Sequence, residues 1–145
     1  MKKTVKIKSI KIELLRESLI NGNIFITSNL YGNSMWPLVS LNDTIYIKFK
    51  KFQSLKKGEI VLFSTKDEIV LHRIVKIENN TLFTRGDNKE KKSIEIVKEK
   101  DYFGILILVK KKRVWVRIGK RGLDCSYYLL PLHKYFKKIV KIKKI

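Results

Sequence analysis

The sequence predicts a mainly β protein: one small antiparallel sheet, coiled or closed into a barrel, with a short helix at each end. Runs of alternating apolar and polar residues, such as Ile45, Ile47 and Phe49, are typical of half-buried strands. Polar turns at 57–58 and 86–88 separate such runs at close spacing, which favours antiparallel pairing. A chain of 145 residues suits one domain with a real core, so we expect a single domain over 1–145.

The first expected element is a helix over 9–20. Ile10, Leu14 and Leu19 recur at helical spacing with charged residues between them. The Asn-Gly-Asn sequence at 21–23 is a typical helix end. We expect the apolar face of this helix to cover the sheet.

Seven strands are expected after the helix, each a short run rich in β-branched, aromatic or aliphatic residues. They span 24–27, 44–49, 59–63, 69–75, 81–84, 102–109 and 113–118. The run at 102–109 is fully apolar but too short to cross a membrane, which predicts a buried strand.

The segment 131–145 ends a basic C-terminal extension over 110–145. Pro131 suits a first helical turn, and apolar residues would then line one face with lysines on the others: Leu132, Tyr135, Phe136, Ile139 and Val140 are the apolar set. Two interpretations stay open. One is an interfacial helix that docks on an anionic membrane surface, and the other is a capping helix with a solvated lysine face.

The chain carries 33 basic and 13 acidic residues, a formal charge of +20, and Asp124 is the sole acidic residue after Tyr102. Such a field favours an anionic partner, whether nucleic acid, acidic lipid or acidic peptide. A bias toward lysine, isoleucine and asparagine across the whole sequence is the alternative explanation. The sequence contains no helix-turn-helix pattern, zinc-ligand set or aromatic RNA motif, which argues against nucleic acid as the partner.

The location expected from the sequence is the cytoplasm, with peripheral membrane association through 131–145. The N-terminal lysines are followed by no long apolar run, so neither a secretory signal nor a membrane span is expected there. The single cysteine, Cys125, cannot form an internal disulfide and is interpreted as a small packed residue. No cofactor or metal is expected.

Three side chains carry the functional interpretation: Ser34 in a turn, His72 in a strand-like run and Asp87 in a second turn. A hydroxyl, a base that works near neutral pH and a carboxylate are the groups that nucleophilic acyl transfer needs. Each residue alone has an ordinary structural explanation, as a turn serine, a core histidine and a turn aspartate.

The neighbours of these residues form motifs. Residues 32–37 read Gly-Asn-Ser-Met-Trp-Pro, 72–75 read His-Arg-Ile-Val and 84–88 read Thr-Arg-Gly-Asp-Asn, while 58–61 read Gly-Glu-Ile-Val. In this order, over about 24–109, the chain resembles the signal peptidase I and LexA-like serine peptidase superfamily. The histidine motif is similar to the Ser-His branch, which includes archaeal, endoplasmic-reticulum and sporulation-type signal peptidases. The glutamate within 58–61 replaces the usual aspartate.

The resemblance implies a LexA and signal peptidase type of fold and a serine endopeptidase that cleaves a leader or signal-like peptide. It implies that Ser34 is the nucleophile, His72 its base and Asp87 the carboxylate that orients the base. The backbone N–H of Ser34 would contribute to an oxyanion and substrate-binding site, with Gly32 and Met35 beside it. The strands around the serine would bind an extended peptide by β-augmentation.

Several alternatives stay open. Asp43 is a second acid near the serine motif and is interpreted as a turn residue, so which carboxylate orients the histidine is undecided. A lysine base is a further alternative, although no lysine stands in a matching motif. Typical signal peptidases carry a transmembrane helix before the serine, whereas 14–30 is too polar to span. The runner-up function is a basic β domain that docks on nucleic acid or membrane without peptidase activity.

Overall fold

The computed structural model describes residues 9–28, 32–66, 68–119 and 125–129. It confirms the predicted fold class: helix α1 (Ser9–Ile20) is followed by a mainly antiparallel β structure that does not close into a barrel. The strands are β1 (Phe25–Thr27), β2 (Thr44–Lys48), β3 (Ile60–Ser64), β4 (Ile69–Glu78), β5 (Thr81–Arg85), β6 (Glu95–Val97), β7 (Tyr102–Lys110), β8 (Val114–Ile118) and β9 (Cys125–Leu129). Short 3-10 helices lie at Phe52–Ser54 and Glu99–Asp101.

All seven predicted strands are present, and the two that sequence patterns missed are β6 and β9. β6 has only three residues, which is too short for a clear alternation. The predicted helix at 131–145 lies outside the described residues. Among the described helices, none is long and apolar enough to cross a membrane.

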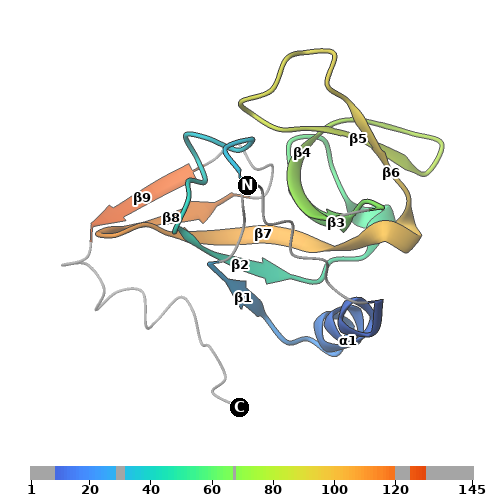
Figure 1. Ribbon diagram of the computed structural model, residues 1–145, viewed down its shortest axis with the longest axis horizontal. Coiled ribbons are helices and arrows are strands. Elements are labelled where there is room, and N and C mark those ends of the chain that lie inside the picture. The colour runs from blue at the N-terminus through green and yellow to red at the C-terminus, as the bar shows by residue number, and fades with distance from the viewer. Residues whose placement is uncertain (1–8, 29–31, 67, 120–124, 130–145) are drawn as a thin grey trace.

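Strand β7 organises the sheet (Figure 1). The order is β1-β2-β7-β3-β4-β5-β6, and all pairings are antiparallel. β7 pairs with β3 through Tyr102–Ile105 and with β8 through Leu108–Lys110. One edge of β7 is therefore paired with two different strands, each along part of its length. Figure 1 shows β3 to β6 curling above one end of β7, while β8 and β9 extend from the other end.

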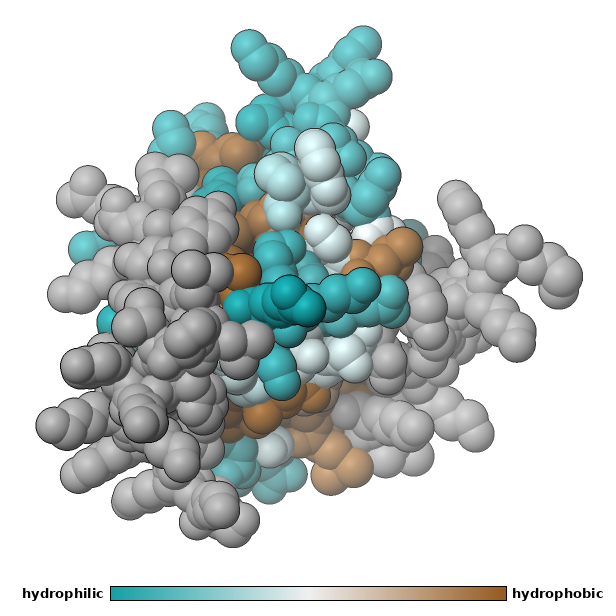
Figure 2. All heavy atoms as spheres, turned by 90° about the vertical axis from the view of Figure 1, so that its left-hand side faces the viewer, coloured by the Kyte–Doolittle hydropathy of each residue, from teal (hydrophilic) through white to brown (hydrophobic). Residues whose placement is uncertain are grey.

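The surface combines charge with isolated apolar side chains. Figure 2 shows hydrophilic side chains over the upper part of one face, with exposed apolar residues below them. The spacing of apolar residues predicted that Leu14 belongs to the face of α1 that covers the sheet. This prediction was wrong, because Leu14 is 60% exposed. That face instead uses Leu19, which is fully buried, together with Ile12 and Leu15.

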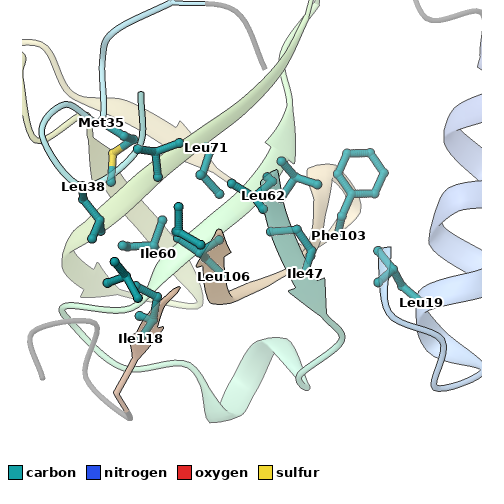
Figure 3. Packing of buried hydrophobic residues seen from close by; sticks show 14 residues of the cluster. Leu19, Met35, Leu38, Ile47, Ile60, Leu62, Leu71, Phe103, Leu106 and Ile118 are labelled. Carbon is teal, nitrogen blue, oxygen red and sulfur yellow. The ribbon is translucent and has the colours of Figure 1, made fainter. Parts of the chain in front are cut away.

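Two apolar clusters lie on opposite faces of β3. Ile60 and Leu62 belong to the first cluster, while Val61 and Phe63 belong to the second, as expected for a strand buried on both faces. Figure 3 shows the first cluster, in which Met35 and Leu38 pack near Leu71. The second lies inside the curl of β3 to β6 and is made of Phe52, Leu55, Val61, Phe63, Ile74, Leu82, Val97 and Tyr102.

The second cluster contains one buried hydroxyl. Tyr102 donates a hydrogen bond to the backbone carbonyl of Lys50 at 2.9 Å, which satisfies the hydroxyl in an apolar surrounding. Burial raises the pKa of the Tyr102 hydroxyl above its ordinary value, and the nearby charge of Glu59 acts in the same direction. The hydroxyl therefore stays protonated and continues to donate.

Candidate active site

The turn that carries Ser34 is fixed to the core by its neighbour. Met35 is 4% exposed and packs in the first apolar cluster, whereas Trp36 on its other side is 55% exposed. The Met35 carbonyl accepts a hydrogen bond from the N–H of Val39 at 2.9 Å, and Asn33 accepts one from Trp36 at 3.0 Å. The Ser34 side chain is half-buried between a buried and an exposed neighbour.

The entry and exit of this turn have special backbone geometry. Gly32 has a φ of 104°, a left-handed conformation that favours glycine. The Trp36-Pro37 peptide bond is cis. Asp43 accepts hydrogen bonds from the Ser40 N–H at 2.8 Å and from Lys111 Nζ at 2.6 Å. The carboxylate of Asp43 thus closes the loop after the serine, in agreement with its interpretation as a turn residue.

A second turn, distant in sequence, lies directly against Ser34. The backbone N–H of Asn88 donates to the Ser34 carbonyl at 2.8 Å, and the Asn88 side-chain amide donates to the Asn33 carbonyl at 3.1 Å. A Cβ atom on Gly86 would lie 2.6 Å from the Ser34 carbonyl oxygen and 2.9 Å from Ser34 Cβ. Only glycine permits this approach, so the Gly-Asp-Asn sequence positions the serine.

His72 lies in the middle of β4 and is 4% exposed. Its Nδ1 atom contacts the Oε2 atom of Glu95. The ring also makes an edge contact with Phe63, with 6.1 Å between centroids. The imidazole therefore has a carboxylate on one nitrogen and an apolar wall beside it.

The turn at 86–88 brings Ser34 next to the end of β5. Arg85, the last residue of β5, lies opposite Arg73, which is the neighbour of His72 on β4. Ser34 covers the position where a Gly86 side chain would stand. Gly86 follows Arg85 directly, so the serine lies at the end of β5, next to the part of β4 that carries His72 and Arg73.

The structure places Asp87 on a different partner. Its two carboxylate oxygens accept hydrogen bonds from Arg73 Nε at 2.8 Å and Arg73 Nη2 at 2.7 Å. Arg73 Nη1 also donates to the Gly58 carbonyl at 2.9 Å. These hydrogen bonds direct the Asp87 side chain toward Arg73. Asp87 is thus next to the site through its turn, while its side chain is bonded to arginine.

Glu95 is the residue that sequence patterns did not single out. It lies opposite Thr84 in the pairing of β5 with β6, and Thr84 lies opposite Ile74 on β4. Ile74 and His72 share a face, so these two pairings bring Glu95 to the histidine across three strands. The three-residue strand β6 gives no recognisable signal, and its register exists only in the folded sheet.

A cationic cleft opens beside the site. It encloses about 580 Å³ and is lined by four cations together with backbone and apolar atoms: Lys56, Lys57, Gly58, Arg73, Ile74, Val75 and Arg85. Its lining includes three consecutive residues of β4, Arg73, Ile74 and Val75. Within the described residues, no group of three or more His, Cys, Asp or Glu side chains could hold a metal ion.

A protein-family model described as Peptidase S24-like matches residues 4–109, a span that includes Ser34, His72, Asp87 and Glu95. A comparison with curated proteins gives no match for this chain. The family match supports a peptidase-type function and confirms the resemblance found in the motifs. The chain therefore belongs to the Peptidase S24-like family, in the LexA and signal peptidase-like superfamily of serine peptidases.

Proposed function

We propose that this protein is a serine endopeptidase in which Ser34 is the nucleophile and His72 the base. The observation that carries the proposal is the seating of the Ser34 turn on Gly86, directly after the β5 residue that pairs with Arg73, the neighbour of His72. The substrate we propose is a peptide or protein with a leader or signal-like segment. Leader cleavage is the finer part of the proposal and follows from the motif resemblance.

In this mechanism the Ser34 hydroxyl attacks the carbonyl carbon of the scissile bond. His72 accepts the serine proton and returns it to the leaving amine, and water then releases the acyl group by the same route. An imidazole suits both transfers near neutral pH. We assign the backbone N–H of Ser34 as one donor to the oxyanion, an interaction worth about 3 kcal/mol in other serine peptidases.

Substrate would bind in extended form beside the serine. β1 is the terminal strand in the described sheet order, and addition of the peptide to the sheet beside the serine turn is the binding mode that we propose. Ile26 on β1 is 51% exposed and Trp36 beside the serine is 55% exposed. Both could contact apolar side chains of a bound peptide.

The test is cleavage of a library of extended synthetic peptides, including leader-like sequences, with fragments identified by mass spectrometry. Replacing Ser34 by alanine should reduce cleavage by roughly 10³-fold or more, because the nucleophile is lost. Ser40→Ala is the matched control, since the Ser40 backbone N–H makes the bond to Asp43 in the same loop. Circular dichroism should show both variants folded. Cleavage that persists in Ser34→Ala would refute the assignment.

Self-cleavage is a second readout of the same site. The family includes LexA-type autoproteases as well as members without catalysis. Incubation of the intact chain alone should show whether Ser34-dependent fragments form at a rate independent of protein concentration. Such a rate would identify the chain as its own substrate.

The alternative function is a basic domain that binds polyanions or anionic membranes without catalysis. The formal charge of +20 and the cleft between Lys56, Lys57, Arg73 and Arg85 favour it. This alternative does not explain why Ser34 packs so closely against Gly86. Binding and catalysis can also coexist in one protein, so each needs its own measurement.

A further inference from the structure

We propose that Glu95 is the carboxylate that orients His72, and that Asp87 instead fixes the turn on which Ser34 rests. The site would then be a Ser34, His72 and Glu95 arrangement, with both acids as positioning residues. This inference rests on the proposed function, because orientation matters only if His72 is the base. The contact itself can be tested without any substrate.

The first support is the contact between Glu95 Oε2 and His72 Nδ1. With its proton on Nδ1, the ring donates to the carboxylate and keeps Nε2 unprotonated, which is the nitrogen that the proposed mechanism needs to accept the serine proton. The His72 side chain is 6% exposed and that of Glu95 is 41% exposed. The buried ring is thus oriented by an acid whose other oxygen can remain hydrated.

The second support is the register that delivers Glu95. Thr84 separates β4 from β6 on this face, and its side chain is small and fully buried. Its hydroxyl donates to the Glu95 carbonyl at 3.4 Å. A small residue at this central position leaves room for the longer glutamate to reach His72. An aspartate on β6 would be shorter by one methylene.

The third support is that the carboxylate of Asp87 already has partners. Its two hydrogen bonds to Arg73 form a bidentate pair, in which the Asp87 side chain is 24% exposed and the Arg73 side chain is 17% exposed. Reaching His72 would require both bonds to break and the side chain to turn away from Arg73. Asp87 can instead stabilise the turn in which the Asn88 N–H donates to Ser34.

The deciding experiment is ¹⁵N and ¹H spectroscopy of the imidazole rings in the full chain near neutral pH. The sequence has two histidines, so a His133→Gln variant assigns the signals of His72. We expect His72 to be protonated on Nδ1, with a downfield proton signal that is lost in Glu95→Gln and kept in Asp87→Asn. The exposed Glu90→Gln is the matched control. The opposite result, loss in Asp87→Asn alone, would overturn the proposal.

A second readout is the cleavage kinetics of a peptide that the unmodified protein cleaves and the Ser34→Ala variant does not. Glu95→Gln should lower kcat roughly 10²-fold or more with little change in KM, since a misoriented base slows the chemical step. Its melting temperature should change little, because Glu95 is partly exposed. Asp87→Asn should lower both the melting temperature and kcat. An unchanged kcat in Glu95→Gln would overturn the proposal, whereas absence of any cleavable peptide would count against the peptidase function alone.

Discussion

Gly86 is the residue at which two motifs from distant parts of the sequence meet. A Cβ atom there would lie 2.6 Å from the backbone oxygen of Ser34, a distance that real Cβ contacts do not reach. The nearby Lys89 Cγ, at 3.0 Å, belongs to a flexible side chain and can move aside. The backbone of the serine turn cannot move without moving the Ser34 side chain. In the proposed mechanism Gly86 therefore has a positional role although it carries no reactive group.

We predict that Gly86→Ala lowers kcat/KM at least tenfold while the protein remains folded. The added methyl group displaces Ser34 relative to His72, and small misplacements of reacting groups are costly. The measurement is peptide cleavage at a temperature where circular dichroism shows a native fold. Activity equal to that of the unmodified protein would contradict the close approach of the two turns.

Gly104 provides a matched comparison at the same scale. A Cβ atom there would meet the Lys48 carbonyl oxygen at 2.7 Å and Ile47 Cγ2 at 2.8 Å, between β7 and β2. Its substitution by alanine overpacks a core pairing, so it should reduce the free energy of unfolding by about 1–3 kcal/mol. Gly104→Ala should therefore reduce stability more, and activity of the folded fraction less, than Gly86→Ala does.

At the scale of elements, the alternation along β4 separates the two faces of the site. His72 and Ile74 are buried on one face of β4 and Arg73 lies on the other, up to a β-bulge between Ile74 and Lys76. Which carboxylate meets His72 depends on the pairings of β4, β5 and β6, a tertiary feature that local patterns do not encode.

Local sequence patterns do not encode strand register, and this explains why they did not identify Glu95. The Ser34, His72 and Asp87 motifs could be found because each has a distinctive local sequence. Glu95 has none, and it reaches His72 only through the successive pairings of β4, β5 and β6. A short strand with a single acid facing inward becomes meaningful only once those pairings are known.

We predict that Arg73→Lys reduces the free energy of unfolding by roughly 1–2 kcal/mol and also lowers activity. Arg73 donates to both oxygens of Asp87 and to the Gly58 carbonyl, and a lysine ammonium cannot reproduce this planar arrangement. The turn at 86–88 would then be less well fixed, and its hydrogen bond to the Ser34 carbonyl would weaken. Urea denaturation and peptide cleavage measure the two effects.

The control for that prediction is the exposed ion pair between Lys76 and Glu78. These side chains are 60% and 50% exposed, and such pairs contribute little to stability. Lys76→Gln should change the free energy of unfolding by less than about 0.5 kcal/mol. If Arg73→Lys had an equally small effect, the bidentate pair would not be what stabilises the turn.

At the scale of the whole molecule, charge is the property that the fold does not explain. A compact sheet with two apolar cores does not need a formal charge of +20. A strongly positive charge raises the local concentration of anionic ligands around a protein. Such attraction would increase the capture rate of acidic peptides without changing the chemistry at Ser34.

We predict that the folded Ser34→Ala variant binds a single-stranded oligonucleotide with an affinity that is independent of base sequence. This affinity should fall at least tenfold between about 50 and 200 mM salt, because binding is dominated by released counterions. Lys56→Glu with Lys57→Glu should weaken binding more than Lys92→Glu with Lys98→Glu, since the first pair lines the cleft and the second pair lies elsewhere on the surface. Fluorescence anisotropy measures both effects. Binding that depends on base sequence and resists salt would instead favour a dedicated nucleic-acid function. Equal weakening by the two pairs of substitutions would show that the attraction comes from the overall charge rather than from the cleft.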